Sequence, residues 1–454
     1  MSVNERLRSP GFKALGIALL ALLMLFPLSQ VRSLISERQA LQLEAQGRIA
    51  SGIGGVQRLG GPVLSIPAQA ITTVTDEVTH DRRTVVTAAA ALRVLPRTLN
   101  IDAVLGMELR HKGIYSLPTY LATIRIRGEF DRQLLAERIL HRNTEDAAHE
   151  QRLEHPEQAV LLLPVGDLKS LRSAKRLEFG AAALQPSSGM LSGMQALSMP
   201  LDLTTLLANG SGTAVPFAFD VIISGSDALN FLPLAAATTV MVQSTWPHPD
   251  YQGAFLPVQK MPQVDGGFKA LWSVLQLNRA IAQSWYGDAL SEEMFTAATF
   301  GVRLMQPSTV YSSNERAVRY GILFIAITFI GFFGWEHLSG HLRLHTMHYL
   351  LVGLALAVFY LLLLALSEHL GFALAYLLAA SALVLLIVVY VAGVTGSRPA
   401  AALNGGLLSV SYGLLYVILQ SEDYALLLGS LLLFATLAAL MVATRKLDWR
   451  ALVS

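Results

Sequence analysis

A glutamate and a histidine, Glu368 and His369, stand between two long apolar runs at 349–366 and 371–394. A charge at the centre of a bilayer costs about 2.5–3.5 kcal/mol on insertion scales, so such a pair needs a structural reason. The sequence favours a solvated hairpin turn of residues 367–370 at the membrane surface. The alternative is that both side chains fold back into a helical bundle and form a polar site there.

Four histidines lie close together in EHLSGHLRLHTMHY, with spacings of 4, 4 and 3 residues. On one helix they would share a face, where neutral imidazoles could bind Zn²⁺ or Ni²⁺. The simpler interpretation is a helix at the membrane surface with amphipathic side chains among the headgroups. Gly340 weakens the single helix that a metal site would need, which counts against metal binding. We therefore predict no metal site and no cofactor. The histidines are His337, His341, His345 and His348.

The segment STWPHPDYQGAFLP at 244–257 offers a second cluster, with Trp246 and His248 between prolines. It could be an exposed recognition loop or a rigid structural corner, and the sequence does not decide between them. Asp250 beside His248 is the single hint of acid–base chemistry for an enzyme acting on envelope polymers. The chain has no cysteine, which excludes thiol catalysis and thiolate metal sites. Phosphate-loop, nucleophile-elbow and dinucleotide motifs are also missing, so we predict no catalytic residues.

Asn404, in an Asn-Gly-Gly stretch, is one of the few polar residues within the predicted membrane spans. Such residues more often bond to neighbouring helices than bind a substrate, and the glycines would allow close helix approach. The predicted spans contain no Asp or Glu. Ion-coupled transporters usually place a carboxylate in the membrane, so this composition counts against transport.

The elements that would position these residues are mostly membrane helices. Of the 454 residues, 53% are hydrophobic and 15% are charged, and the mean hydropathy is +0.48. A span needs about 20 apolar residues. Six runs qualify, the first being an uncleaved anchor whose helix continues through 36–49. The runs are 14–31, 317–335, 349–366, 371–394, 400–419 and 424–444.

Lysine and arginine in the short loops set the orientation. They occur in the tail at 1–13, in the loops with Arg343 and Arg398, and in the tail at 445–454, while the loops at 367–371 and 420–424 have none. The positive-inside rule therefore places both termini in the cytoplasm. The bundle at 317–444 then spans the membrane, and residues 32–316 form a domain outside the cytoplasm.

This domain reads as α+β, dominated by antiparallel sheet. β-Branched and aromatic residues predict strands at 83–95, 119–130, 214–225 and 238–246. Helical spacing predicts helices at 132–141 and 272–285. The Ser- and Gly-rich stretch 185–200 is expected to be a loop.

Several long motifs stand out along the chain: RLGGPVLSIP (58–67), HKGIYSLPTY (111–120), IRGEFD (126–131), STWPHPDYQGAFLP (244–257), GGFKALW (266–272), RAVRYGILFIAITFIGFF (316–333) and LRLHTMHYLLVGLALAVFYLLLLALSEHLGFALAY (342–376). Together they resemble the CreD family of inner-membrane proteins. The resemblance runs nearly end to end, is least clear over 132–200, and departs from the family pattern at Thr346, which replaces a proline. Because Glu368 and His369 belong to the last motif, the resemblance gives that pair more weight.

The resemblance implies a bundle in the bacterial inner membrane, a periplasmic domain, and a link to envelope integrity, colicin tolerance and a two-component system that raises expression. The missing catalytic motifs and the large outside domain favour a non-enzymatic role. The resemblance carries over no catalytic residues. The expected partners are inner-membrane lipids and envelope proteins or polymers; a net charge of +2 implies no nucleic acid. The alternative function is a transporter or lipid-handling protein that uses the C-terminal bundle, with the polar residues of the spans at 371–394 and 400–419 facing one cavity near Glu368 and Asn404.

Overall fold

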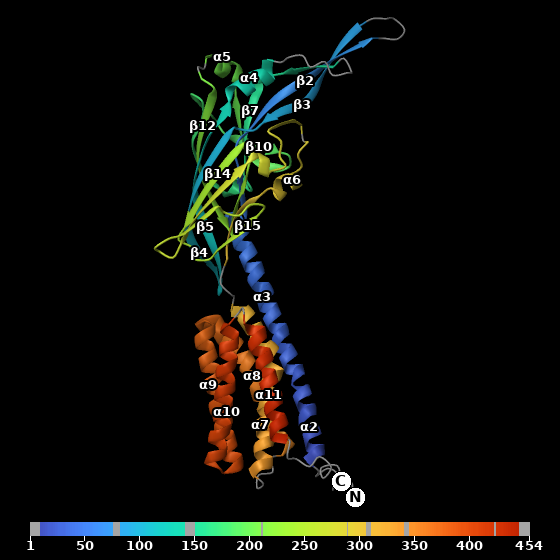
Figure 1. Cartoon of the computed structure of the whole chain (residues 1–454), viewed down its shortest axis with the longest axis vertical. Helices are drawn as coiled ribbons and strands as arrows, with labels where there is room; N and C mark the ends of the chain where they lie inside the picture. The colour runs from blue at the N-terminus through green and yellow to red at the C-terminus, as the bar shows by residue number, and fades with distance from the viewer. Residues whose placement is uncertain are drawn as a thin grey trace. The chain divides into compact units, whose positions relative to one another are not determined.

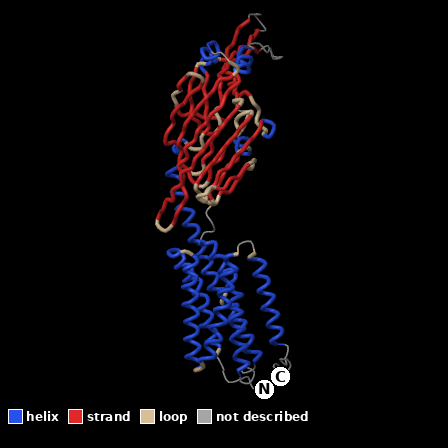
Figure 2. The backbone as a smooth tube through the Cα atoms, turned by 60° about the vertical axis from the view of Figure 1, so that its left-hand side comes forward, coloured by secondary structure: helices blue, strands red, loops and turns tan. Residues whose placement is uncertain are grey.

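The computed structural model describes residues 10–75, 82–140, 150–209, 212–287, 289–305, 310–339, 345–421 and 424–444. The chain divides into two compact units. A helical unit is made of residues 1–44 and 308–454, and a strand-rich unit is made of residues 45–307. Figures 1 and 2 show the helices of the first unit and the strands of the second.

The helical unit holds the expected membrane segments. Five helices in the described residues are long and apolar enough to cross a membrane, and they fall at 13–53, 310–336, 346–370, 372–395 and 398–420. A sixth apolar helix follows at the C-terminal end. The helices are α2 (Pro10–Leu23), α3 (Leu25–Ile53), α7 (Val310–Ser339), α8 (Thr346–Leu370), α9 (Phe372–Thr395), α10 (Arg398–Gln420) and α11 (Ala425–Thr444).

The first helix continues well beyond the apolar run, as the sequence predicts. A single residue, Met24, separates α2 from α3. Pro27 explains the interruption, because it has no backbone N–H to give to the carbonyl of Leu23 four residues earlier. The helix resumes directly, and the Leu28 N–H donates to the Met24 carbonyl.

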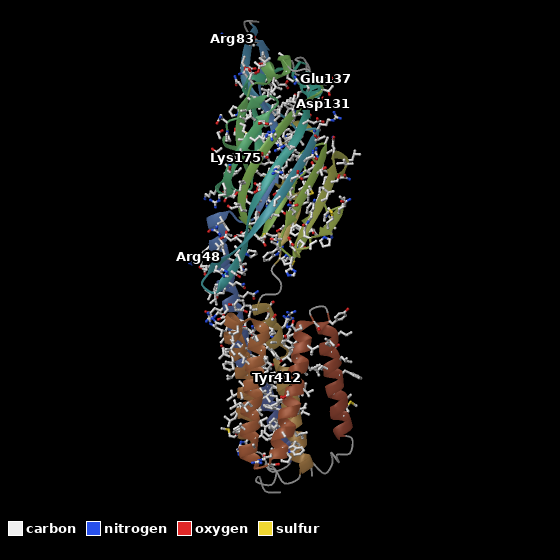
Figure 3. All side chains as sticks on the ribbon, turned by 90° about the vertical axis from the view of Figure 1, so that its left-hand side faces the viewer. Arg48, Arg83, Asp131, Glu137, Lys175 and Tyr412 are labelled. Carbon is white, nitrogen blue, oxygen red and sulfur yellow. The ribbon has the colours of Figure 1, made fainter. Side chains whose placement is uncertain are left out.

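An aromatic layer fills the middle of the bundle. Phe359 on α8 makes edge-on contacts with Tyr376 on α9 and Tyr412 on α10, with centroids 5.7 and 4.7 Å apart. The Tyr376 hydroxyl donates to the Tyr412 carbonyl at 2.6 Å, and Figure 3 shows Tyr412 within the helices. Edge-to-face ring pairs add to apolar burial, so this layer fastens α8, α9 and α10 together.

The strand-rich unit contains three sheets in its described residues. The largest has the order β16 (Gln259–Pro262), β17 (Phe268–Leu275), β14 (Ala237–Ser244), β4 (Thr98–Lys112), β5 (Tyr115–Asp131), β12 (Ala214–Ser226), β8 (Leu171–Phe179), β9 (Ala182–Ala183). The second has the order β10 (Ser187–Leu191), β11 (Met194–Leu201), β7 (Ala159–Pro164), β2 (Val63–Thr75), β3 (Arg82–Val94), β18 (Ser284–Tyr286), with β6 (Glu150–Glu154) also beside β2. The third has the order β1 (Gln57–Gly60), β13 (Ala228–Leu232), β19 (Phe300–Leu304), β15 (Pro249–Gly253).

Short helices connect the strands: α4 (Arg132–Leu140), α5 (Leu203–Asn209) and α6 (Glu292–Ala297), with 3₁₀ turns at Pro156–Gln158, Leu168–Ser170 and Gln276–Asn278. Strand pairing is mainly antiparallel, as the sequence predicts. Among the described strands the parallel pairs are β14 with β4 and β1 with β13.

Alternating burial explains why the two large sheets pack face to face. Along β4 the buried residues Leu99, Ile101, Ala103 and Leu105 alternate with exposed ones. They join a single apolar core with residues of the second sheet, such as Leu161. Period-2 alternation is what a sheet with one buried face requires. The strands predicted at 83–95, 119–130, 214–225 and 238–246 correspond to β3, β5, β12 and β14, and the helix predicted at 132–141 corresponds to α4.

Two predictions for this unit are wrong. The expected loop at 185–200 is the hairpin of β10 and β11, turned by Ser192 and Gly193, whose φ angles are 46° and 90°. The expected helix at 272–285 begins as strand β17, in which Trp272 and Val274 are buried while Ser273 and Leu275 are exposed. The alternating burial, which needs a partner sheet, overrides the local helical spacing.

Candidate functional site

The Glu368–His369 pair lies in the last turn of α8, so the predicted hairpin turn at 367–370 is wrong. Gly371 alone, with a φ of 75°, separates α8 from α9. A residue with this positive φ is most easily a glycine, which explains why the reversal needs so few residues. Ser367 is 1% exposed, and the Glu368 side chain is 11% exposed. His369 is exposed, so only part of the pair turns into the bundle.

A polar network, here the Glu368 cluster, surrounds these two inward residues. It consists of Arg38, Tyr311, Asn314, Ser367 and Glu368. The Tyr311 hydroxyl donates to Glu368 Oε1 at 3.0 Å, and Arg38 Nε lies 3.9 Å from the same oxygen. Asn314 Nδ2 donates to Ser367 Oγ at 2.9 Å and to the Val310 carbonyl at 2.8 Å. The cluster therefore ties α3, α7 and α8 together.

Asn314 stands out within the Glu368 cluster because it is only 1% exposed. Its Oδ1 atom is buried and has no hydrogen-bond partner among the described residues. A buried amide oxygen without a donor costs about 1–3 kcal/mol, and a water molecule or cation would remove that cost. The cluster thus presents a carboxylate and a spare acceptor from neighbouring helices.

A second polar group, the Glu336 cluster, lies toward the opposite end of α8. Glu336 near the end of α7 pairs with Lys13 of α2 and accepts a hydrogen bond from the Tyr349 hydroxyl at 3.0 Å. Tyr349 and Glu368 are 19 residues apart on one helix, which corresponds to about 28 Å at 1.5 Å per residue. The hydrocarbon core of a bilayer is about 30 Å thick. The two charged clusters are therefore spaced to lie at its two boundaries.

Asn404 does not join the Glu368 cluster. It lies in the second turn of α10, and α9 leads from the Glu368 end of the bundle to the start of α10. Its Nδ2 donates to the Ala400 carbonyl at 2.9 Å, within its own helix. A Cβ on Gly405 would come within 2.5 Å of Val388, so this stretch does bring α10 close to α9. Glu368 and Asn404 thus do not face one cavity.

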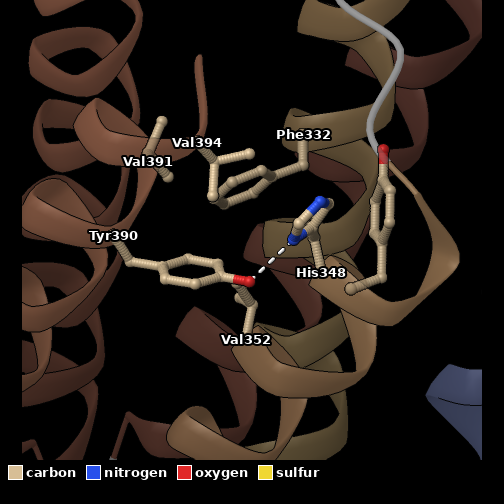
Figure 4. Close-up of a pocket in the computed structure, with 7 residues that line it drawn as sticks. Phe332, His348, Val352, Tyr390, Val391 and Val394 are labelled. Carbon is tan, nitrogen blue, oxygen red and sulfur yellow. Dashed lines mark hydrogen bonds between the residues drawn. The ribbon is translucent and has the colours of Figure 1, made fainter. Parts of the chain in front are cut away.

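Of the histidines at described positions, His337 lies on α7, whereas His345 and His348 lie at the start of α8, so these three do not share one face of a single helix. His345 caps α8 by accepting the Met347 N–H at 3.2 Å. His348 Nδ1 lies 2.7 Å from the Tyr390 hydroxyl, beside a cavity of about 10 Å³ (Figure 4). Such a volume holds one water molecule at most. His341 and the side chain of His337 lie outside the described residues.

The segment 244–257 forms a corner that is held by backbone contacts. The Trp246 indole N–H donates to the Met305 carbonyl at 2.9 Å, and the Met305 N–H donates to the His248 carbonyl at 3.1 Å. Asp250 is opposite Arg303 in the pairing of β15 with β19. The imidazole of His248 is exposed. These contacts favour the rigid corner over the recognition loop and give no support to a His248–Asp250 catalytic pair.

Sequence reasoning missed three members of the Glu368 cluster: Arg38, Tyr311 and Asn314. A signal for two of them was present, because Tyr311 and Asn314 are spaced i, i+3 in the polar stretch before the second apolar run and so share one face of a helix. Arg38 carries no comparable signal. Its approach to Glu368 depends on how α3 packs against the bundle.

The described fold defines a class: a multi-pass membrane protein with a large strand-rich domain between its first helix and its C-terminal bundle. Comparison with known proteins narrows this class. Residues 9–450 match the family described as Inner membrane protein CreD. The chain is 31% identical to Inner membrane protein CreD of Escherichia coli (strain K12), over 98% of this chain and 95% of that protein. The chain belongs to the CreD family of multi-pass inner membrane proteins.

Proposed function

We propose that this protein is a non-enzymatic inner-membrane protein that supports cell-envelope integrity under stress, including tolerance to colicins. Its strand-rich unit lies in the periplasm and engages envelope proteins or polymers. The helical unit anchors it, with both termini in the cytoplasm. Membership of the CreD family supports the inner-membrane part of this proposal.

One observation carries the proposal furthest. Residues 45–307 form a compact unit with its own core, placed in the sequence between spanning helices. The connections on the side predicted to be cytoplasmic carry Arg343 and, at the start of α10, Arg398, whereas the connections between α8 and α9 and between α10 and α11 carry neither lysine nor arginine. The positive-inside rule then places the large unit outside the cytoplasm, where its partners would be envelope components.

The absence of native cysteine allows a direct test of orientation. We would introduce Ser273→Cys on the exposed face of β17 and, as the control, Ser454→Cys in the C-terminal tail. Spheroplasts are treated with a membrane-impermeant maleimide. The expected result is labelling of Cys at 273 in intact spheroplasts and of Cys at 454 only after lysis. The reverse pattern would overturn the proposed topology.

The proposed role in envelope integrity is tested in a strain that lacks the gene for this protein. The expected result is increased sensitivity to a colicin and to detergent, reversed by the wild-type chain. Unchanged sensitivity would overturn the envelope role. Trp272→Ala, which removes a fully buried side chain of β17, should abolish the rescue, whereas Ser273→Ala next to it should not. Both variants must be present in the membrane at equal amounts for this comparison.

The alternative, a transporter or lipid-handling bundle, predicts that polar residues of α9 and α10 face one cavity near Glu368 and Asn404. The separation of these two residues and the small volume beside His348 weigh against it. Native mass spectrometry of the protein in mild detergent distinguishes the two functions. A stoichiometric lipid that remains bound would favour the alternative, and a retained envelope protein would favour the function proposed above.

A further inference from the structure

A polar pocket of about 210 Å³ opens in the strand-rich unit. Its walls come from β1, the end of β7, the turn between β10 and β11, the end of β13 and the first turn of α6. The volume is below the 300–1,000 Å³ of pockets for drug-sized ligands, so a smaller solute fits it. The lining residues used below are Arg58, Pro164, Gly193, Met194, Leu232 and Glu292.

Opposite charges face the pocket from two different elements. Arg58 Nη1 on β1 is 3.9 Å from Glu292 Oε1 on α6 and 3.3 Å from Thr296 Oγ1. The two side chains are 37% and 54% exposed. A guanidinium has five N–H donors, and these long contacts leave most of them available for a ligand. An ion pair this loose and this exposed adds little to stability, so a ligand could replace it at little cost.

The backbone around the pocket is fixed before any ligand arrives. The Gly166 N–H donates to the Arg58 carbonyl at 2.8 Å, and the Val165 N–H donates to the Gln195 carbonyl at 2.9 Å. The Leu168 N–H also donates to Gln195 Oε1 at 2.8 Å. Because these bonds hold β1 against β7 and β11, binding would require little ordering of the walls.

A glycine keeps the pocket open. Gly193 has a φ of 90°, and a Cβ added there would lie 3.1 Å from Glu292 Oε2. A side chain at this position would therefore enter the space beside the carboxylate. Pro164, Met194 and Leu232 supply apolar surface next to the two charges.

We propose that this pocket binds a small zwitterion, specifically a free dipeptide of small apolar residues. The ligand carboxylate binds the Arg58 guanidinium, whose planar fork matches a carboxylate. The ligand ammonium binds Glu292, and the small side chains rest on Met194 and Leu232. The ligand carboxylate replaces the Glu292 carboxylate as the partner of Arg58, and the ligand ammonium replaces the Arg58 guanidinium as the partner of Glu292. This inference does not depend on which side of the membrane the unit occupies.

The test uses the full-length protein in nanodiscs and isothermal titration with three probes: L-alanyl-L-alanine, its N-acetyl derivative, and its C-terminal amide. The expected result is binding of the free dipeptide and at least tenfold weaker binding of each blocked form. Arg58→Ala and Glu292→Gln should each weaken binding of the free dipeptide at least tenfold, and Arg58→Lys should recover part of the loss at Arg58.

A matched control comes from another ion pair of the same unit. Arg97 Nε and Glu129 Oε1 are also 3.9 Å apart, but they do not line the pocket. Arg97→Ala should leave dipeptide binding unchanged. Melting curves of all variants check that the unit is folded. The proposal is overturned if the wild-type protein does not bind the dipeptide, or if folded Arg58→Ala and Glu292→Gln both bind it as the wild type does.

Discussion

Tyr311 on α7 donates its phenolic hydrogen to Glu368 on α8 over 3.0 Å. The first turn of one membrane helix thereby holds a carboxylate in the last turn of the next. Arg38 Nε of α3 lies 3.9 Å from the same carboxylate oxygen, and Asn314 Nδ2 donates a hydrogen bond to Oγ of the preceding Ser367. Ionisable residues within membrane helices usually pair with other polar groups, and this network gives Glu368 such partners beside a long apolar run.

Removing the phenol should loosen the helical unit. We expect Tyr311→Phe to lower its free energy of unfolding by about 1.5–3 kcal/mol, the range for a hydrogen bond to a charged group. His369→Ala is the control, because that side chain is exposed and the change should stay within about 0.5 kcal/mol. Unfolding in mixed micelles measures both. Equal midpoints for the two variants would show that the Tyr311–Glu368 contact contributes nothing.

Reactivity of introduced cysteines should distinguish adjacent positions at the end of α8. Ser367 is 1% exposed, whereas His369 is exposed. We therefore expect His369→Cys to react with an impermeant maleimide in spheroplasts and Ser367→Cys to react much more slowly. Denatured protein is the control and should label at both positions. Fast reaction of a cysteine at position 367 in the folded protein would instead support the solvated hairpin turn that the sequence predicts.

The sequence predicts the membrane helices well because each depends on a local property, a run of apolar residues long enough to span. It does not predict the Glu368 cluster, because Arg38 and Glu368 are 330 positions apart and meet only through helix packing. The hairpin prediction failed for a local reason. One glycine at 371 suffices to reverse the chain, so Ser367 and Glu368 stay helical.

In the strand-rich unit, too, features with a strong local signal are predicted and features that depend on packing are not. The sequence predicts β5 and β12 from their β-branched and aromatic residues. The hairpin of β10 and β11 was missed, because its Ser-Gly turn lies in a stretch rich in serine and glycine, a composition that also describes loops. Trp272 was assigned to a helix, although its burial against the opposite sheet fixes it in a strand.

Two glycines of the bundle should respond differently to an added methyl group. A Cβ on Gly353 in α8 would lie 2.9 Å from Phe329 and 3.0 Å from the sulfur of Met24, whereas nothing lies within 4 Å of a Cβ on Gly334 in α7. We expect Gly353→Ala to destabilise the bundle by about 1–3 kcal/mol through overpacking. Gly334→Ala should be neutral or stabilising by up to about 1 kcal/mol. Thermal unfolding in detergent compares the two, and equal shifts would contradict the close packing at Gly353.

The strand-rich unit should lose stability in alkali through Tyr120. Burial, together with the nearby charge of Asp227, raises the pKa of its phenol above the usual value of about 10. As the pH rises, the unfolded chain therefore releases the proton before the folded chain does. The free energy of unfolding then decreases above a pH of about 10. Below that pH the contribution is constant.

Tyr120→Phe checks this assignment. The variant loses the hydrogen bond from the hydroxyl to the Ala228 carbonyl at 2.8 Å, so we expect it to be less stable at neutral pH by about 1 kcal/mol. It should also lose less stability between pH 9 and pH 11 than the wild type, a window of about one unit on either side of the usual value. Some loss of stability in alkali is still expected in the variant, because burial also raises the pKa of Tyr251. Parallel curves for both proteins would exclude Tyr120 as the source.

The corner at 244–257 provides the last prediction. Trp246 holds the chain at Met305 through its indole N–H, while the His248 imidazole is exposed. We expect Trp246→Phe, which keeps an aromatic ring but removes the donor, to lower the stability of the strand-rich unit by about 0.5–1.5 kcal/mol. His248→Ala should leave it unchanged. If His248→Ala instead abolishes rescue of the envelope phenotype without lowering the melting temperature, the segment acts in recognition as well as in structure.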